Sequence, residues 1–76
     1  MLNNEMIIKI KSIVEKAKSK YDIKTIKCEL NNFNNVILTI ICKQRNFVFT
    51  VFEDGNTISG ATGKDFKEME INNILV

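Results

Sequence analysis

The stretch VILTIICKQRNFVFTVFEDGNTISG, residues 36–60, decides the fold. Residues 36–42 and 47–52 are almost continuously apolar and rich in β-branched and aromatic side chains, which is typical of strands. The short KQRN segment between them favours an antiparallel hairpin. Asp54–Gly55 is a strong signal for a second tight hairpin, which leads into a strand over residues 57–60. The stretch therefore predicts three antiparallel strands in sequence.

Another strand and a helix precede this stretch. Residues 25–30 alternate between apolar and polar side chains, as a strand with one buried face does. The asparagine-rich residues 31–35 predict a turn. Nearer the N-terminus, Asn3 or Asn4 can cap a helix with a single apolar stripe. The stripe recurs at spacings of three and four residues and contains Met6, Ile7, Ile10, Ile13, Val14, Ala17 and Tyr21.

The C-terminal residues KDFKEMEINNILV (64–76) predict a second helix. Thr62 or Asp65 can cap it, and Glu68 follows Asp65 at the spacing of a capping box. The expected architecture is α+β, in the order α-β-β-β(-β)-α, with an antiparallel sheet and two helices on one face. With 76 residues, the chain is expected to form a single domain over residues 1–76.

The composition indicates a globular domain and points away from membranes and catalysis. No apolar run approaches the roughly 18 residues that span a bilayer, and the N-terminus does not resemble a signal peptide, so a cytoplasmic location is expected. The chain has no histidine, the commonest general base, and no evident pair of nucleophile and base. Cys28 and Cys42 are expected to be reduced and buried. We therefore expect no enzyme, metal, cofactor or small-molecule substrate.

Glycines followed by lysines mark the candidate binding site. Gly60 and Gly63 precede Lys64 and Lys67, at the expected start of the second helix. A helix N-terminus offers free backbone amides and the positive end of the dipole, both of which suit a phosphate. Lysines are otherwise poorly placed in a first helical turn, which favours a functional reason for them.

The stretch FVFTVFEDGNTISGATGKDFKEMEINN (47–73) resembles the C-terminal half of a double-stranded-RNA-binding domain of the ribonuclease III type. The resemblance is strongest over residues 46–73. It rests on the aromatic strand, the Asp-Gly hairpin, the glycine turn and the lysine-bearing helix start. Phe66 stands where the family usually has a lysine, and residues 22–35 are additional to the family pattern.

The resemblance implies a small non-catalytic protein that binds structured or double-stranded RNA by shape, through phosphate contacts. The resemblance implies that the glycine turn and the helix start hold the phosphates, through Thr62, Gly63, Lys64 and Lys67. The first helix would contact one minor groove through Asn4 and Lys9. The KQRN turn would contact the other minor groove through Arg45.

A protein-interaction module is the alternative. The central strands carry apolar side chains on both faces, which a sheet with one solvated face does not require. The second face could contact another copy of the chain, as a homodimer, or a larger protein that the chain regulates or inhibits. The candidate interface residues are Ile37, Ile41, Val48 and Phe52.

Overall fold

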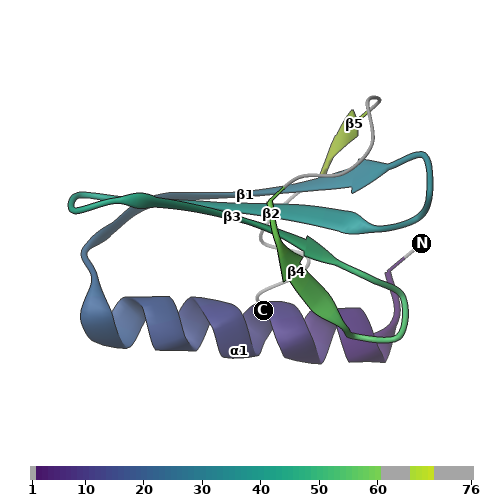
Figure 1. The fold of residues 1–76 in the computed structure, drawn as a ribbon, viewed down its shortest axis with the longest axis horizontal. Helices are drawn as coiled ribbons and strands as arrows, with labels where there is room; N and C mark the ends of the chain where they lie inside the picture. Colours follow the sequence, from purple (N-terminus) through teal and green to yellow (C-terminus); the bar gives the residue numbers. More distant parts are fainter. Residues whose placement is uncertain (1, 61–65, 70–76) are drawn as a thin grey trace.

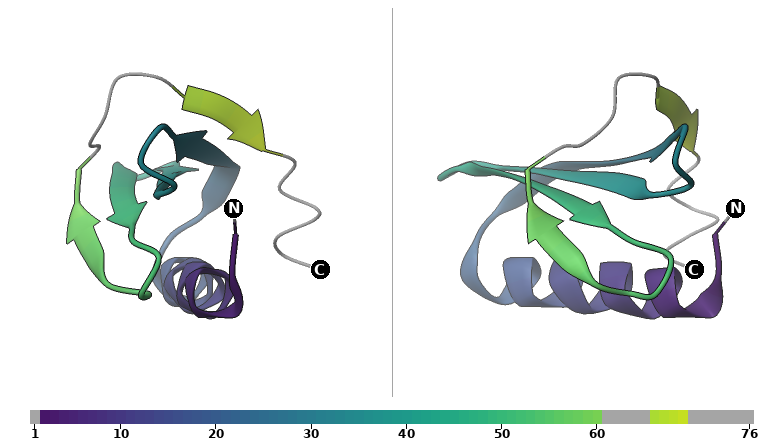
Figure 2. Two further views of the ribbon diagram at one scale, coloured as in Figure 1. Left: turned by 90° about the vertical axis from the view of Figure 1, so that its right-hand side faces the viewer. Right: turned by 45° about the vertical axis from the view of Figure 1, so that its right-hand side comes forward.

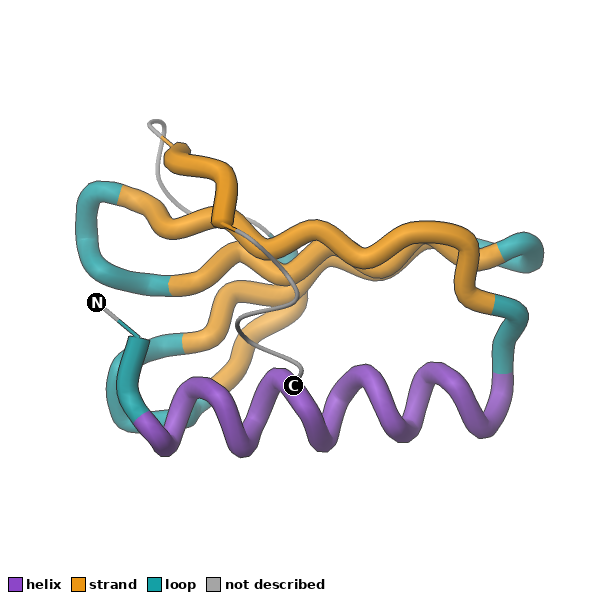
Figure 3. The backbone as a smooth tube through the Cα atoms, turned by 180° about the vertical axis from the view of Figure 1, so that it is seen from behind, coloured by secondary structure: helices purple, strands orange, loops and turns teal. Residues whose placement is uncertain are grey.

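The computed structural model describes residues 2–60 and 66–69 (Figure 1). In chain order the elements are α1 (Asn4–Lys20), β1 (Ile23–Asn31), β2 (Val36–Cys42), β3 (Asn46–Val51), β4 (Thr57–Ser59) and β5 (Phe66–Met69). The strands form one antiparallel sheet in the order β4-β3-β2-β1-β5. α1 lies along one face of this sheet (Figures 1 and 3). The α+β prediction is confirmed.

The first helix forms as its sequence predicts. Asn3 is the N-cap, and its side-chain oxygen accepts a hydrogen bond of 3.0 Å from the backbone N–H of Met6. Glu5 lies in the first turn, whereas Lys18 and Lys20 lie in the last turn, an arrangement that complements the helix dipole. The buried residues recur at helical spacing, so the stripe faces the sheet. They are Met6, Ile10, Val14 and Ala17.

The core lies between α1 and the inner face of the sheet. From β2 the even-numbered side chains point inward and are buried, while Phe47, Phe49 and Val51 reach the core from β3. Ile26, Cys28 and Leu30 do so from β1, which confirms the alternation predicted there. Cys28 and Cys42 are free and buried, also as predicted. The remaining residues of β2 and β3 therefore face away from the helix, since side chains alternate along a strand.

The Asp-Gly hairpin is confirmed, and it joins the sheet to the start of α1. Gly55 has φ +86°, which glycine adopts without strain, and its N–H donates to the Phe52 carbonyl at 2.9 Å. The side chain of Asn3 donates to the Glu53 carbonyl at 2.8 Å. The same residue thus caps the helix and binds the turn between β3 and β4.

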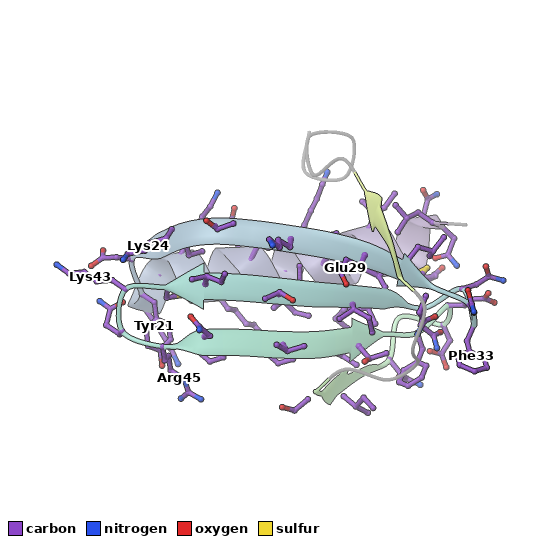
Figure 4. All side chains as sticks on the ribbon, turned by 90° about the horizontal axis from the view of Figure 1, so that it is seen from above. Tyr21, Lys24, Glu29, Phe33, Lys43 and Arg45 are labelled. Carbon is purple, nitrogen blue, oxygen red and sulfur yellow. The ribbon has the colours of Figure 1, made fainter. Side chains whose placement is uncertain are left out.

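The asparagine turn between β1 and β2 is organised by one buried side chain. The Oδ1 atom of Asn31 accepts hydrogen bonds of 3.0 Å from the backbone N–H groups of Phe33 and Asn35. Asn34 adopts a left-handed conformation with φ 60°. Phe33 is exposed at this end of the sheet (Figure 4).

The prediction of a second helix is wrong for residues 66–69, the part of it that the structure describes. Phe66–Met69 form β5, which pairs antiparallel with β1 in the register Leu30↔Lys67. Without β5, β1 would be an edge strand with unpaired backbone N–H and C=O groups, and pairing satisfies them. The remainder of the predicted helix, residues 64–65 and 70–76, lies outside the described residues.

β4 covers only part of its neighbour. Its three residues pair with Phe49, Thr50 and Val51, and the N–H of Gly60 donates to the Val48 carbonyl at 2.8 Å. Figure 2 shows β4 out of the plane of the sheet, beginning near the N-terminal half of α1 and pointing away from the helix. The start of β3 is therefore not paired by β4, at the end of the molecule where α1 terminates.

Candidate functional site

The phosphate site predicted at the second helix falls mostly outside the part of the chain that the structure describes. Thr62, Gly63 and Lys64 lie outside the described residues. Lys67 lies in β5, opposite Leu30, and not in the first turn of a helix. The prediction that its charge reinforces a helix N-terminus is therefore wrong, because the backbone there is extended and paired with β1.

The other predicted RNA contacts lie at opposite ends of the fold. Asn4 and Lys9 are exposed on the N-terminal half of α1. Arg45 lies in the turn between β2 and β3, beside the C-terminal end of the helix (Figure 4). A helix of 17 residues is about 25 Å long, so Asn4 and Arg45 cannot contact the same phosphate.

The predicted protein interface falls mainly on the outer face of the sheet. Ile37, Ile41 and Val48 point away from α1, as their places in β2 and β3 require. Ile37 is buried, while Ile41 and Val48 are half-buried. Phe52 directly follows β3 and is half-buried, and its N–H donates to the Asn56 carbonyl at 2.8 Å.

A concentrated positive charge occupies the end of the molecule where α1 terminates. It combines the last turns of the helix, the start of β1 and the turn between β2 and β3, and we call it the basic end. Asp22 is the acidic residue at this place in the chain, between the helix and β1. The cations assigned to the basic end are all exposed, and they are Lys16, Lys20, Lys24, Lys43 and Arg45. Figure 4 shows Lys24, Lys43 and Arg45 at this end of the sheet.

Hydrogen bonds fix the two chain segments that carry these cations. The N–H of Lys43 donates to the Asp22 carbonyl at 2.8 Å. The side chain of Gln44 both accepts from the Asp22 N–H and donates to the Asp22 carboxylate, each at 3.1 Å. β1 also shifts register between Ile23 and Thr25, which leaves Lys24 as the extra residue of a bulge. The Asp22 carboxylate is thus engaged by Gln44, while the five cations are exposed.

An apolar groove opens beside the basic end, between the last turns of α1 and the start of β3, which β4 does not pair. Its volume is about 390 Å³. Tyr21, Phe47 and Phe49 provide aromatic walls, Ala17 and Ile40 provide aliphatic surface, and the remaining lining residues are Ile13, Lys16, Ser19 and Lys20. We call it the aromatic groove. It exists because β4 is too short to cover this part of the sheet.

The three rings pack closely against one another. Phe47 and Phe49 are nearly parallel, with an interplanar angle of 9° and centroids 6.1 Å apart. Tyr21 meets Phe47 edge-on, with centroids 5.1 Å apart. The guanidinium carbon of Arg45 lies 4.5 Å from the centroid of Phe47, within cation–π range. Arg45 therefore joins the basic end to the aromatic groove.

Sequence reasoning did not find this groove. The sequence pattern places Tyr21 in the helix stripe and Phe47 and Phe49 in an apolar strand, and all three do pack on the core. The signal available in the sequence is the lysine-rich stretch over residues 9–27, which contains Tyr21. Whether these lysines lie near Arg45 depends on the direction in which α1 crosses the sheet.

No group of three or more histidine, cysteine, aspartate or glutamate residues that could hold a metal occurs within residues 2–60 and 66–69. Over the same residues, the structure contains no helix with the length and hydropathy of a membrane span. Comparison of the chain with protein-family models, curated proteins and solved structures gave no match.

Proposed function

We propose that the chain is a non-catalytic RNA-binding protein whose basic end holds the phosphate backbone of structured RNA. The observation that carries the proposal is the convergence of five cations from three separate segments of the chain. Neutralising phosphates with lysine and arginine releases counterions, and this supplies most of the affinity of such proteins for nucleic acid.

A solvated charged surface is the simplest alternative explanation of these lysines. It accounts for Lys20, which complements the C-terminal end of the helix dipole. It does not account for Lys24, Lys43 and Arg45, which lie on a bulge and a turn. A basic surface next to exposed aromatic rings is the combination that nucleic-acid-binding proteins use. In this molecule the half-buried rings of Tyr21, Phe47 and Phe49 lie beside the basic end.

Fluorescence anisotropy with labelled RNA tests the proposal. Hairpin RNA with an unpaired loop should bind at low salt, and more tightly than duplex DNA of the same length. The double variant Lys43→Gln/Arg45→Gln should weaken RNA binding at least tenfold, because two phosphate contacts are removed.

The matched control is Lys9→Gln/Lys27→Gln, which removes the same charge from exposed positions outside the basic end. The resemblance implies an RNA contact for Lys9, whereas the function proposed here assigns it none. It should bind RNA nearly as well as the unaltered chain. Equal losses in the two double variants would show that net charge alone drives association, and absence of RNA binding at low salt would refute the proposal.

Protein interaction through the outer face of the sheet is the second candidate function. Its support is the cluster of apolar side chains there, in which Ile58 is 44 % exposed and lies opposite Thr50. Analytical ultracentrifugation tests the homodimer. A dimer that Val48→Lys converts into a folded monomer would favour this candidate, whereas a monomer at all concentrations would remove the homodimer.

A further inference from the structure

We propose that the aromatic groove takes one unpaired base of the bound RNA while the basic end holds the phosphates on either side. This inference rests on the function proposed above and adds a substrate class to it: RNA with single-stranded loops, bulges or ends.

The shape and chemistry of the groove suit a planar aromatic ring. Its volume of about 390 Å³ lies within the range of small-ligand sites, so a base can enter without displacing the core. Tyr21, Phe47 and Phe49 present ring surfaces from two different elements. Every nucleobase has a π-face, so stacking on such rings tolerates any sequence.

The rim of the groove selects an anionic occupant. Lys16 and Lys20 line it from the helix, and the Arg45 guanidinium lies over the ring of Phe47, which is one of its walls. Among the described residues that line it, none is acidic. A neutral apolar molecule would use the walls and leave these cations without a partner. A nucleotide uses both, since its base and its phosphate are joined at a short, fixed spacing.

The base must be unpaired. Within a duplex, both faces of each base are covered by stacked neighbours, and the deep major groove of A-form RNA does not admit side chains. In loops, bulges and ends, bases can turn outward and stack on aromatic side chains. The groove is a recess at the end of a rigid sheet, so the base has to enter it, and a paired base cannot.

Tyrosine fluorescence provides a direct test, because Tyr21 is the only tyrosine and the chain has no tryptophan. A base stacked in the groove should quench the emission of Tyr21. We expect a short single-stranded oligouridine to quench it with saturation, and a blunt, fully paired RNA duplex to bind without quenching. Each should be titrated at low salt, with anisotropy of a labelled RNA measured in parallel.

Two variants separate the groove from the phosphate contacts. Ala17→Leu fills the groove from α1 without altering charge, and Tyr21→Leu replaces one ring by an aliphatic side chain. Circular dichroism and thermal unfolding should first establish that each variant folds. Each should lower affinity for oligouridine about tenfold, within the range produced by loss of one base–aromatic stack, and leave duplex affinity unchanged.

The outcomes distinguish this inference from the function on which it rests. If Lys43→Gln/Arg45→Gln weakens binding of both RNAs while Ala17→Leu and Tyr21→Leu change neither, the chain binds RNA but the groove does not hold a base. Quenching of Tyr21 by laurate and not by oligouridine would also overturn the inference, because the groove would then bind an anionic amphiphile. Absence of RNA binding would refute the proposed function itself.

Discussion

Asn31 shows how one side chain shapes a whole turn. Its amide oxygen is the acceptor for two backbone N–H groups, and the residue is only 4 % exposed. Asn31→Ala should therefore lower the free energy of unfolding by about 1–3 kcal/mol, because two partly buried donors lose their acceptor. Urea denaturation of the unaltered chain and of Asn31→Ala measures this change, and the two m-values should be equal.

Asn34→Gly is the matched control within the same turn. Asn34 has φ 60°, a conformation that glycine adopts at least as readily. We expect its free energy of unfolding to stay within about 0.5 kcal/mol of the unaltered chain. If both variants lose the same stability, the hydrogen bonds to Asn31 are not what holds the turn.

The buried thiol of Cys28 makes the stability of the fold depend on pH in the alkaline range. Burial raises the pKa of its thiol from 9.0 to about 11. Between these values the unfolded chain loses this proton and the folded chain keeps it, so stability should fall as the pH rises from 9 to 11. The shift corresponds to a loss on the order of 2 kcal/mol.

Urea denaturation at several pH values between 8 and 10.5 checks this, with Cys28→Ala as the comparison. The variant is expected to be less stable at pH 8, because a buried side chain is shortened, but to lose less stability with pH. Parallel pH profiles for the two proteins would show that the Cys28 thiol does not contribute to the dependence.

At the scale of elements, the pairing of β5 with β1 is the feature that most needs a test. The N–H of Asn31 donates to the Asn35 carbonyl and so points toward β2. Because the direction alternates along a strand, the N–H of Leu30 points toward β5, opposite Lys67. The N–H of Lys67 should therefore bond to β1, and that of Glu68 should point away from it.

Two proline variants use this difference. Lys67→Pro removes a ladder donor and should speed hydrogen exchange at the amide of Leu30, whereas Glu68→Pro should affect it much less. A helix beginning at residues 64–65 would accept proline in its first turn at either place, and exchange at Leu30 would then be unchanged in both variants. Amide exchange followed by NMR resolves the individual residue.

The elements that could be predicted are those specified by nearby residues. β2 spans the predicted residues 36–42, and the turn at Asp54–Gly55 forms because glycine supplies the required φ. The second helix was predicted from signals that are equally local, namely the capping spacing of Asp65 and Glu68. The competing interaction is the free edge of β1, which lies more than thirty residues away and leaves no mark within that window.

The same distinction applies to the candidate site. The lysines near the end of α1 are evident from sequence, as is Arg45 in its turn. Their convergence depends on the direction in which α1 crosses the sheet, and the groove depends on β4 ending after three residues. Both are consequences of tertiary packing, so sequence periodicity could not reveal them.

At the scale of the molecule, the described surroundings of the two ends of α1 differ in charge. The basic end lies at the C-terminus of α1, and Glu5, Glu53 and Asp54 lie at its N-terminus and in the adjacent turn between β3 and β4. The two ends are about 25 Å apart, the length of the helix. At physiological ionic strength the Debye length is about 8 Å, so the acidic end scarcely reduces the attraction of an anion to the basic end. The net charge of +2 therefore understates the local field.

Salt dependence measures how many cations of the basic end contact phosphate. For single-stranded RNA the logarithm of the association constant should fall linearly with the logarithm of salt concentration, with a slope of about −0.7 per phosphate neutralised. Five cations set a limiting slope of about −3.5, and Lys43→Gln/Arg45→Gln should reduce its magnitude by about 1.4. Lys9→Gln/Lys27→Gln should leave the slope unchanged, because those lysines lie outside the basic end. A control variant that flattened the slope equally would mean that RNA contacts the whole surface, and the basic end would then have no distinct role.

Ala17→Leu supplies the complementary result. It should weaken binding at every salt concentration and leave the slope unchanged, because stacking in the groove releases no counterions.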